Sequence, residues 1–171
     1  MFTGLDTKPS LIVFDLDGTL WPFDCDSFDR SKFHSKNGLV YDESNTELAP
    51  YSSSEAILRS IKAQPDIKLA VASRTTSPKV ARQLLHMYSW YDLFDYLEIY
   101  PSCKIQHFKE LKKKSNIPFC EMLFFDDLSW NISDVSSLGV HAHLVHNGVD
   151  SHVLRNALVD FAKHSIVTSQ P

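Results

Sequence analysis

Five short runs of apolar and β-branched residues recur along the chain, and segments with helical signals separate them. The runs cover Leu11–Phe14, Ile67–Ala72, Tyr96–Tyr100, Met122–Phe125 and His141–Val145. Most of them are continuous rather than alternating, which is typical of strands that are covered on both faces. The alternation of strand and helix predicts a Rossmann-like α/β domain with a mostly parallel sheet and helices on both faces.

Helices are expected between these runs. Ser52 and Glu55 stand three residues apart, as in a capping box, just before an apolar helical pattern. Ser77 followed by Pro78 predicts a helix that starts with proline in its first turn. Further helical stretches are expected over residues 104–114, 131–138 and 151–164.

Residues 21–50 do not follow this alternation. They contain the pair Asn37-Gly38 between apolar residues, and this dipeptide is typical of a tight hairpin turn. We therefore predict a small β-hairpin flap that projects from the sheet.

The chain length of 171 residues agrees with a single domain over residues 1–171, with a compact core at about 9–165 and loosely held ends. Lys and Arg number 17 and Asp and Glu 21, for a net charge of −4, so we expect no nucleic-acid partner. The longest apolar runs are too short to cross a bilayer, and no basic segment precedes an apolar one at the start. Three cysteines without a CxxC pair indicate reduced thiols. We expect a soluble cytoplasmic monomer.

Polar residues of the types that take part in catalysis or metal binding follow four of the predicted strands. In chain order they are Asp15 and Asp17, Ser73 and Arg74, Lys104, and the pair Asp126 and Asp127. The carboxyl ends of parallel strands meet at one edge of a sheet, where open α/β sheets bind ligands. Clustered carboxylates repel one another unless a cation is present, and oxygen ligands favour Mg²⁺ over zinc. A hydroxyl and an ammonium beside that metal suit a phosphoryl group, so these residues predict a Mg²⁺-dependent phosphate site.

The same residues carry a resemblance. The string DLDGT at 15–19, the serine after the second strand, the lysine that opens a later helix and the late Asp-Asp pair resemble the four motifs of the haloacid dehalogenase superfamily of phosphohydrolases. Within that superfamily the chain is similar to the small eukaryotic magnesium-dependent phosphatase family over about residues 10–165. The family has an aromatic residue where this chain has Gly18. This departure concerns a substrate contact rather than the chemistry.

The resemblance implies a role for each residue of the site. Asp15 is expected to be the nucleophile that forms an aspartyl-phosphate, and Asp17 the general acid and base. Ser73, Lys104 and the backbone N–H of Leu16 are expected to hold the phosphoryl oxygens. Arg74 either binds the substrate phosphate or is a surface residue of its loop.

The metal ligands implied are the Asp15 and Asp127 carboxylates and the backbone carbonyl of Asp17. Asp126 is expected to reach the metal through water or to pair with Lys104. The sequence leaves the order of the two acids open.

The segments between the motifs are accounted for by the flap, two helices and one strand, which leaves no room for a cap domain. The resulting open site suggests a phosphotyrosine or phosphoprotein phosphatase whose specificity is set by the flap. A phosphatase of sugars or sugar adducts, of the fructosamine-phosphate type, is the alternative. A non-catalytic phosphate-binding scaffold is a third, and the complete set of motif residues argues against it.

Several features also have simpler interpretations. An Asp-x-Asp string alone can be a turn, Asp126 and Asp127 can cap the next helix, and Lys104 can be a solvated helix residue. His141, His143 and His146 resemble a zinc motif, but no Cys or acid stands at ligand spacing, so we interpret them as strand and loop residues.

Two further groups lie outside the motifs. The run Lys112–Lys114 is interpreted as the solvated last turn of a helix rather than a nucleic-acid contact. Trp21–Phe23 can be either core or pocket wall, whereas Trp90 and Phe94 are expected in the core.

Overall fold

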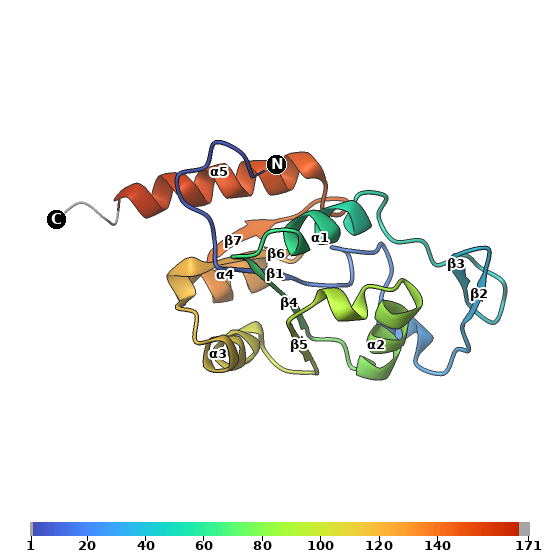
Figure 1. Ribbon diagram of the computed structural model, residues 1–171. Coiled ribbons are helices and arrows are strands. Elements are labelled where there is room, and N and C mark those ends of the chain that lie inside the picture. Colours follow the sequence, from blue (N-terminus) through green and yellow to red (C-terminus); the bar gives the residue numbers. More distant parts are fainter. Residues whose placement is uncertain (1, 168–171) are drawn as a thin grey trace.

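The computed structural model describes residues 2–167, with side chains up to residue 164. Five parallel strands form one sheet in the order β5-β4-β1-β6-β7 (Figure 1). They are β1 Leu11–Phe14, β4 Lys68–Ser73, β5 Tyr96–Ile99, β6 Met122–Asp126 and β7 His141–Leu144. The predicted parallel α/β fold is therefore confirmed, and β1 lies at its centre.

Helices cover both faces of the sheet, as predicted. They are α1 Ser54–Lys62, α2 Pro78–Met87, α3 Lys104–Ser115, α4 Ser129–Ser136 and α5 Ser151–Val167. One apolar core joins one face of β1 to α1, α2 and α5, and a second core joins its other face to α3 and α4. Alternate residues of β1 enter the two cores: Ile12 and Phe14 the first, Leu11 and Val13 the second. This burial on both sides explains why the strand is apolar throughout.

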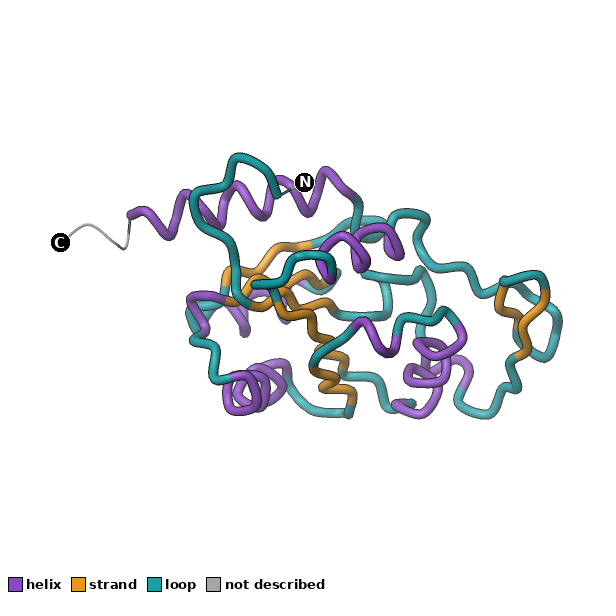
Figure 2. The backbone as a smooth tube through the Cα atoms, viewed as in Figure 1, coloured by secondary structure: helices purple, strands orange, loops and turns teal. Residues whose placement is uncertain are grey.

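The hairpin forms where it was predicted. Strand β2 (His34–Lys36) pairs antiparallel with β3 (Leu39–Tyr41). Asn37 and Gly38 both have positive φ, 54° and 78°, as a tight hairpin turn requires. Figure 2 shows the hairpin beyond the edge of the main body, joined to it by two long loops.

The capping box predicted at Ser52 is wrong. Helix α1 begins at Ser54, and no side chain hydrogen-bonds to its first N–H groups. The buried Ser54 hydroxyl instead donates to the Leu20 carbonyl, 2.8 Å away, and Glu55 pairs with Arg59 one turn on. The Ser54 hydroxyl thus bonds to a distant part of the chain, and the Glu55 carboxylate bonds to Arg59 on the same helix face. Neither group caps the start of the helix.

The segment before β1 packs more closely than expected for a loose end. Phe2 is buried in the core of α1, α2 and α5, and the Arg155 guanidinium donates to the Thr3 carbonyl. Residue 1 and residues 168–171, the outer ends of the expected domain, lie outside the described residues. Among residues 2–167, no helix has both the length and the apolar character that a membrane span requires.

Candidate active site

A cavity of about 390 Å³ opens at the carboxyl ends of β1, β4 and β6. Six of the predicted site residues line it: Asp15, Asp17, Ser73, Arg74, Lys104 and Asp127. The parallel order of the three strands brings their following loops together, although these loops lie far apart in the sequence. The juxtaposition expected from the sequence is therefore present.

Lys104 lies at the base of this cavity. It is the first residue of α3 and is only 1% exposed, so the solvated-helix interpretation is wrong. Its Nζ donates to Asp15 Oδ1 at 2.6 Å, lies 2.9 Å from Asp126 Oδ2 and also donates to the Ala72 carbonyl. An ammonium has three N–H donors, and these acceptors use all of them. Lys104 would therefore reach a phosphoryl oxygen only by releasing one of them.

Asp15 follows the central strand and is buried. Burial raises the pKa of its carboxyl group to about 7, even though the neighbouring Lys104 ammonium lowers it, while Asp126 and Asp17 raise it further. The carboxylate form of Asp15 thus depends on nearby positive charge.

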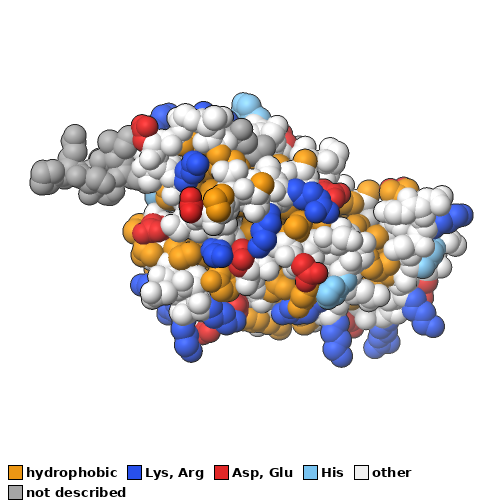
Figure 3. All heavy atoms as spheres, in the orientation of Figure 1, with side chains coloured by type: hydrophobic (Ala, Val, Ile, Leu, Met, Phe, Trp, Pro, Cys, Tyr) orange, Lys and Arg blue, Asp and Glu red, His pale blue; other side chains and the backbone are white. Residues whose placement is uncertain are grey.

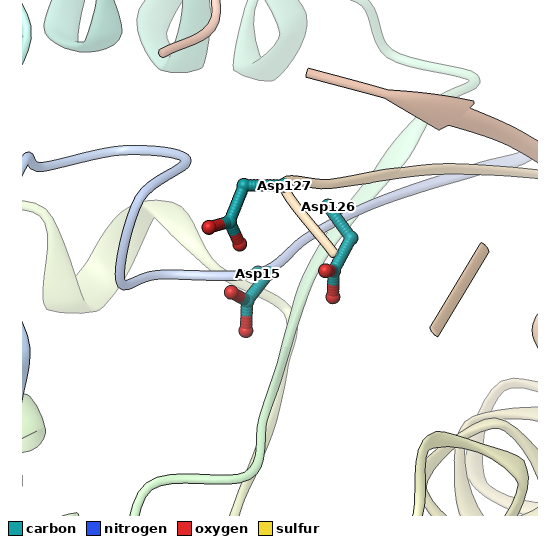
Figure 4. A group of neighbouring side chains, drawn as sticks. All are labelled: Asp15, Asp126 and Asp127. Carbon is teal, nitrogen blue, oxygen red and sulfur yellow. The ribbon is translucent and has the colours of Figure 1, made fainter. Parts of the chain in front are cut away.

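Three carboxylates converge at the ends of β1 and β6 (Figure 4). Asp15, Asp126 and Asp127 each place an oxygen within 4.8 Å of the others. Asp126 is fully buried, and its oxygens accept from Lys104, from the Leu128 N–H and from the Asn131 amide. Asp127 Oδ1, in contrast, is buried without a hydrogen-bond partner. A buried, unpaired carboxylate oxygen in an all-oxygen cluster suits a hard divalent cation such as Mg²⁺.

Asp17 is held by two donors. The Trp21 indole donates to one carboxylate oxygen at 2.7 Å, and the Cys25 backbone N–H donates to the other at 3.0 Å. Burial raises the pKa of Asp17, and these hydrogen bonds partly oppose it. Trp21 is fully buried and does not line the cavity, so its role is core packing and the orientation of Asp17. Cys25 is not among the site residues predicted from the sequence, because its hydrogen bond to Asp17 depends on how the chain turns between residues 17 and 25.

Gly18 lies against the side chain of Asp127. Its φ is +74°, and a Cβ built there would lie 2.3 Å from Asp127 Oδ2. A side chain at this position requires Asp127 to adopt another conformation. In this chain the glycine and the position of Asp127 therefore depend on each other.

Arg74 and Asn131 connect two walls of the cavity. Arg74 is exposed, and its Nη1 donates to Asn131 Oδ1 at 3.1 Å. Asn131 is 1% exposed and uses its amide N–H groups on Asp126. Asn131 thus orients both the Arg74 guanidinium at the mouth of the cavity and the buried Asp126 carboxylate behind it. Only the packing of α4 reveals this role.

The short helix η1 (Cys25–Phe28) contributes Asp26 to the lining of the cavity. Asp26 Oδ1 accepts from the Thr75 hydroxyl at 2.5 Å and from the Ser77 N–H at 3.1 Å. Burial raises the pKa of Asp26, but the hydrogen bonds from the loop outweigh this effect, so its net shift is downward. Ser77 precedes α2 as predicted, but its hydroxyl oxygen accepts no hydrogen bond from the helix N–H groups, and the hydroxyl donates to Asp29. Asp26 therefore fastens the loop that carries Ser73.

We expect Asp26→Ala to lower the free energy of unfolding by about 1–2 kcal/mol, because it leaves loop donors without their acceptor. The value of kcat should fall as well, since the Ser73 loop loses its anchor. Urea unfolding followed by circular dichroism measures the first effect. Asp26→Asn keeps one acceptor oxygen and should lose less, so equal losses in both variants would contradict this role.

The expected influence of the flap is only partly supported. Of residues 21–50, Asp24 and Asp26 line the cavity, whereas no residue of β2 or β3 does. Strand β3 instead borders a separate cavity of about 400 Å³ beside the end of α2. The hairpin itself therefore does not border the active-site cavity, because the long loops carry it away from the strand ends.

The secondary features have structural roles. Lys112–Lys114 form the exposed last turn of α3, as predicted, and Lys114 pairs with the buried Glu98. Figure 3 shows Lys and Arg side chains along the edge of the molecule that includes α3. His141 and His143 lie on β7. The centroid of the His141 ring lies 4.6 Å from that of the Phe161 ring. Trp90 and Phe94 are buried, as predicted.

His107 is a buried residue one turn after Lys104. Its Nε2 lies 2.9 Å from the Tyr100 carbonyl oxygen, which joins the start of α3 to the end of β5. Burial lowers the pKa of His107 to about 4, while the hydrogen bond to Tyr100 opposes this shift. The folded protein therefore holds a neutral imidazole here.

His107 should make stability depend on pH. Between pH 6.5 and 4 the unfolded chain protonates this imidazole and the folded chain does not, so the free energy of unfolding falls as the pH falls. The full effect is on the order of 3 kcal/mol. His107→Gln retains a donor for the Tyr100 carbonyl and does not titrate, so it should flatten this part of the curve. An exposed control, His146→Gln, should keep the wild-type slope, and identical slopes for His107→Gln and wild type would contradict the assignment.

The sheet order and the four polar positions at its carboxyl edge define a phosphohydrolase of the haloacid dehalogenase type. The chain belongs to the acid phosphatase family, whose model matches residues 7–164. It is 41% identical to human magnesium-dependent phosphatase 1 over 156 residues, which cover 91% of this chain and 88% of the relative. It is 40% identical to a HAD-like hydrolase superfamily protein of Schizosaccharomyces pombe, over 77% of this chain and 83% of that protein.

A solved structure shares the fold. The N-terminal part of a Bacteroides fragilis protein, which contains a phosphatase domain complexed with Mg, superposes with a TM-score of 0.60 at 15% identity. The match covers 92% of this chain and 40% of that one. The predicted superfamily and enzyme class are confirmed, and the name of the human relative agrees with the predicted metal.

Proposed function

We propose that this protein hydrolyses phosphomonoesters in the presence of Mg²⁺ through an aspartyl-phosphate on Asp15. The observation that carries the proposal is the arrangement at the end of β1. There a buried Asp15, hydrogen-bonded to Lys104, lies beside Asp127, whose Oδ1 has no partner. A nucleophile held in place beside carboxylate oxygens that can bind a divalent cation is what in-line phosphoryl transfer requires.

Two displacements at phosphorus complete the reaction. In the first, an Asp15 oxygen forms a bond to phosphorus, the bond to the alcohol oxygen breaks, and Asp17 gives that oxygen its proton. In the second, water attacks phosphorus, the bond to Asp15 breaks, and Asp17 takes the proton from the water. Burial raises the pKa of Asp17, which favours the protonated form needed at the start. Ser73 and the Leu16 N–H hold the phosphoryl oxygens, and Lys104 joins them by releasing one of its three acceptors, Asp15, Asp126 or the Ala72 carbonyl.

The metal would be held by the carboxylates of Asp15 and Asp127 and by the backbone carbonyl of Asp17. Asp126 lies behind them, where Lys104 and Asn131 occupy its oxygens. When bound, Mg²⁺ supplies positive charge that offsets the charge of the phosphoryl oxygens. Lys104 holds the Asp15 and Asp126 carboxylates, and Asn131 also holds Asp126, around the position that the metal would take.

The proposed substrates are phosphotyrosine and phosphoproteins. The cavity has no cap over it among the described residues, because the chain between the motifs, outside the remote hairpin, forms only η1, α1, β4, α2, a short 3-10 helix (Tyr91–Leu93) and β5. Phosphorylated sugars or sugar adducts are a second candidate, since all but two residues that line the cavity are polar or charged. An open mouth admits a protein side chain, and a polar lining suits a sugar.

The experiment is hydrolysis of para-nitrophenyl phosphate by the purified protein, followed by a panel of phosphopeptides and sugar phosphates. We expect turnover with Mg²⁺ and its loss in EDTA, because the carboxylates of the site repel one another and the substrate when no cation is present. Restoring Mg²⁺ should restore activity. Turnover that EDTA leaves unchanged would contradict the metal-dependent mechanism, and a folded protein without any turnover would favour the phosphate-binding scaffold.

A further inference from the structure

Trp130 is an exposed aromatic residue at the mouth of the cavity. It is 56% exposed, and it lies near the start of α4. Among residues 2–164, whose side chains the structure describes, three large apolar residues are exposed, Leu39, Trp130 and Leu144, and of these Trp130 alone lines the cavity of the reactive aspartates. An indole left in water forgoes the stabilisation that burial would give it, so its position needs a reason.

Hydrogen bonds to Asp126 hold the chain on both sides of Trp130 in place. The Leu128 N–H two residues earlier donates to Asp126 Oδ1 at 2.8 Å. Asn131, the next residue, donates to both oxygens of Asp126 and accepts from Arg74. Trp130 is therefore attached on both sides to groups that hold the acidic cluster, and its distance from the reacting atoms is set by them.

The remaining walls offer little apolar surface. Trp130 and Leu128 are the two apolar residues that line the cavity, and Leu128 is only partly exposed. The cavity is also lined by the carboxylates of Asp24, just before η1, and of Asp26 within it. An additional negative charge on the alcohol half of a substrate meets repulsion there, whereas a flat uncharged group can stack on the indole.

We propose that Trp130 determines which phosphomonoesters are preferred, by stacking on a flat, unsaturated group in the alcohol half of the substrate. This inference rests on the proposed function, because it assigns one half of the ester to the phosphate site and the other half to Trp130. The indole touches the leaving group and takes no part in the transfer of the phosphoryl group.

The test compares two esters of the same phosphate. Phenyl phosphate carries a flat ring and glycerol 3-phosphate does not. Trp130→Ala should lower kcat/KM for phenyl phosphate by about fivefold to tenfold, and for glycerol 3-phosphate by less than about twofold. Trp130→Phe should keep most of the wild-type preference. Leu144→Ala, which removes an exposed apolar residue outside the cavity, should leave both substrates unaffected.

A binding measurement separates this inference from the proposed function. The chain has three tryptophans, and Trp21 and Trp90 are buried, so iodide should quench mainly Trp130. In the Asp15→Asn protein with Mg²⁺, phenyl phosphate should protect the fluorescence from iodide and glycerol 3-phosphate should not. This measurement needs binding and no turnover.

Each outcome decides one of the two questions. A selective loss for phenyl phosphate, together with selective protection from iodide, supports the role of Trp130. Equal losses on both esters, or no protection by phenyl phosphate, overturn it. If the wild-type protein hydrolyses neither ester, the proposed function fails, and the iodide measurement alone then decides whether the indole meets the flat group. Unchanged kinetics in Trp130→Ala for both esters would overturn it as well.

Discussion

Asp15→Asn is expected to lower kcat for para-nitrophenyl phosphate by at least about 10³-fold at saturating Mg²⁺. The amide has nearly the shape of the carboxylate, but it lacks the negative charge and the lone-pair reactivity that form the aspartyl-phosphate. Lys104 keeps Asp126 and the Ala72 carbonyl as acceptors in this variant, so the fold should persist. Steady-state rates with circular dichroism of the same samples measure both effects.

The matched control is Asp24→Asn, which makes the same chemical change on an exposed carboxylate of the same cavity. It should alter kcat by less than about threefold, because exposed charges are screened by water. Acid quenching during turnover of labelled phosphate ester should trap a phosphoprotein in the wild type and none in Asp15→Asn. An Asp15→Asn protein that still forms this phosphoprotein would place the nucleophile elsewhere.

Lys104→Met should have the largest effect on stability. The ammonium is 1% exposed and lies between Asp15 and Asp126, so its removal leaves two buried carboxylates close together without the positive charge that compensates them. Breaking a buried ion pair in this way costs about 3–5 kcal/mol. We expect a loss of that size in urea unfolding at pH 7.5 in EDTA, together with a loss of activity.

Two comparisons sharpen this prediction. Lys113→Met, on the exposed last turn of the same helix, should change stability by less than about 0.5 kcal/mol. Mg²⁺ should recover part of the loss in Lys104→Met, because a cation among the carboxylates replaces some of the missing positive charge. If the two lysine variants unfold at the same urea concentration, Lys104 does not stabilise the acidic cluster.

The pattern of the chain was sufficient for the architecture. Continuous apolar runs indicate strands buried on both faces, and parallel strands bring the ends of β1, β4 and β6 together whatever the loops contain. The pair Asn37-Gly38 predicted the hairpin because its local turn chemistry needs no distant partner. The positions of Asp15, Ser73 and Lys104 at strand or helix ends follow from the same reasoning.

Tertiary packing decided the interactions between segments that lie far apart in the chain. Ser54 bonds to a distant carbonyl instead of capping its own helix, and Asp26 reaches the Ser73 loop across 49 positions. Asn131 links Arg74 to Asp126, and no spacing in the sequence shows this contact. Hydrogen-bond partners depend on which surfaces meet, and one sequence does not state that.

The sequence by itself determined the strands, their apolar character and the residue types at their carboxyl ends, because these depend on local periodicity and on residue chemistry. Only the tertiary structure decided that Lys104 is buried between two acids, that Asp127 keeps an unpaired oxygen and that the hairpin lies away from the cavity. It also decided that Trp130 stands exposed beside the reactive group. Burial and distance arise when separate elements pack, so they become visible only in the folded chain.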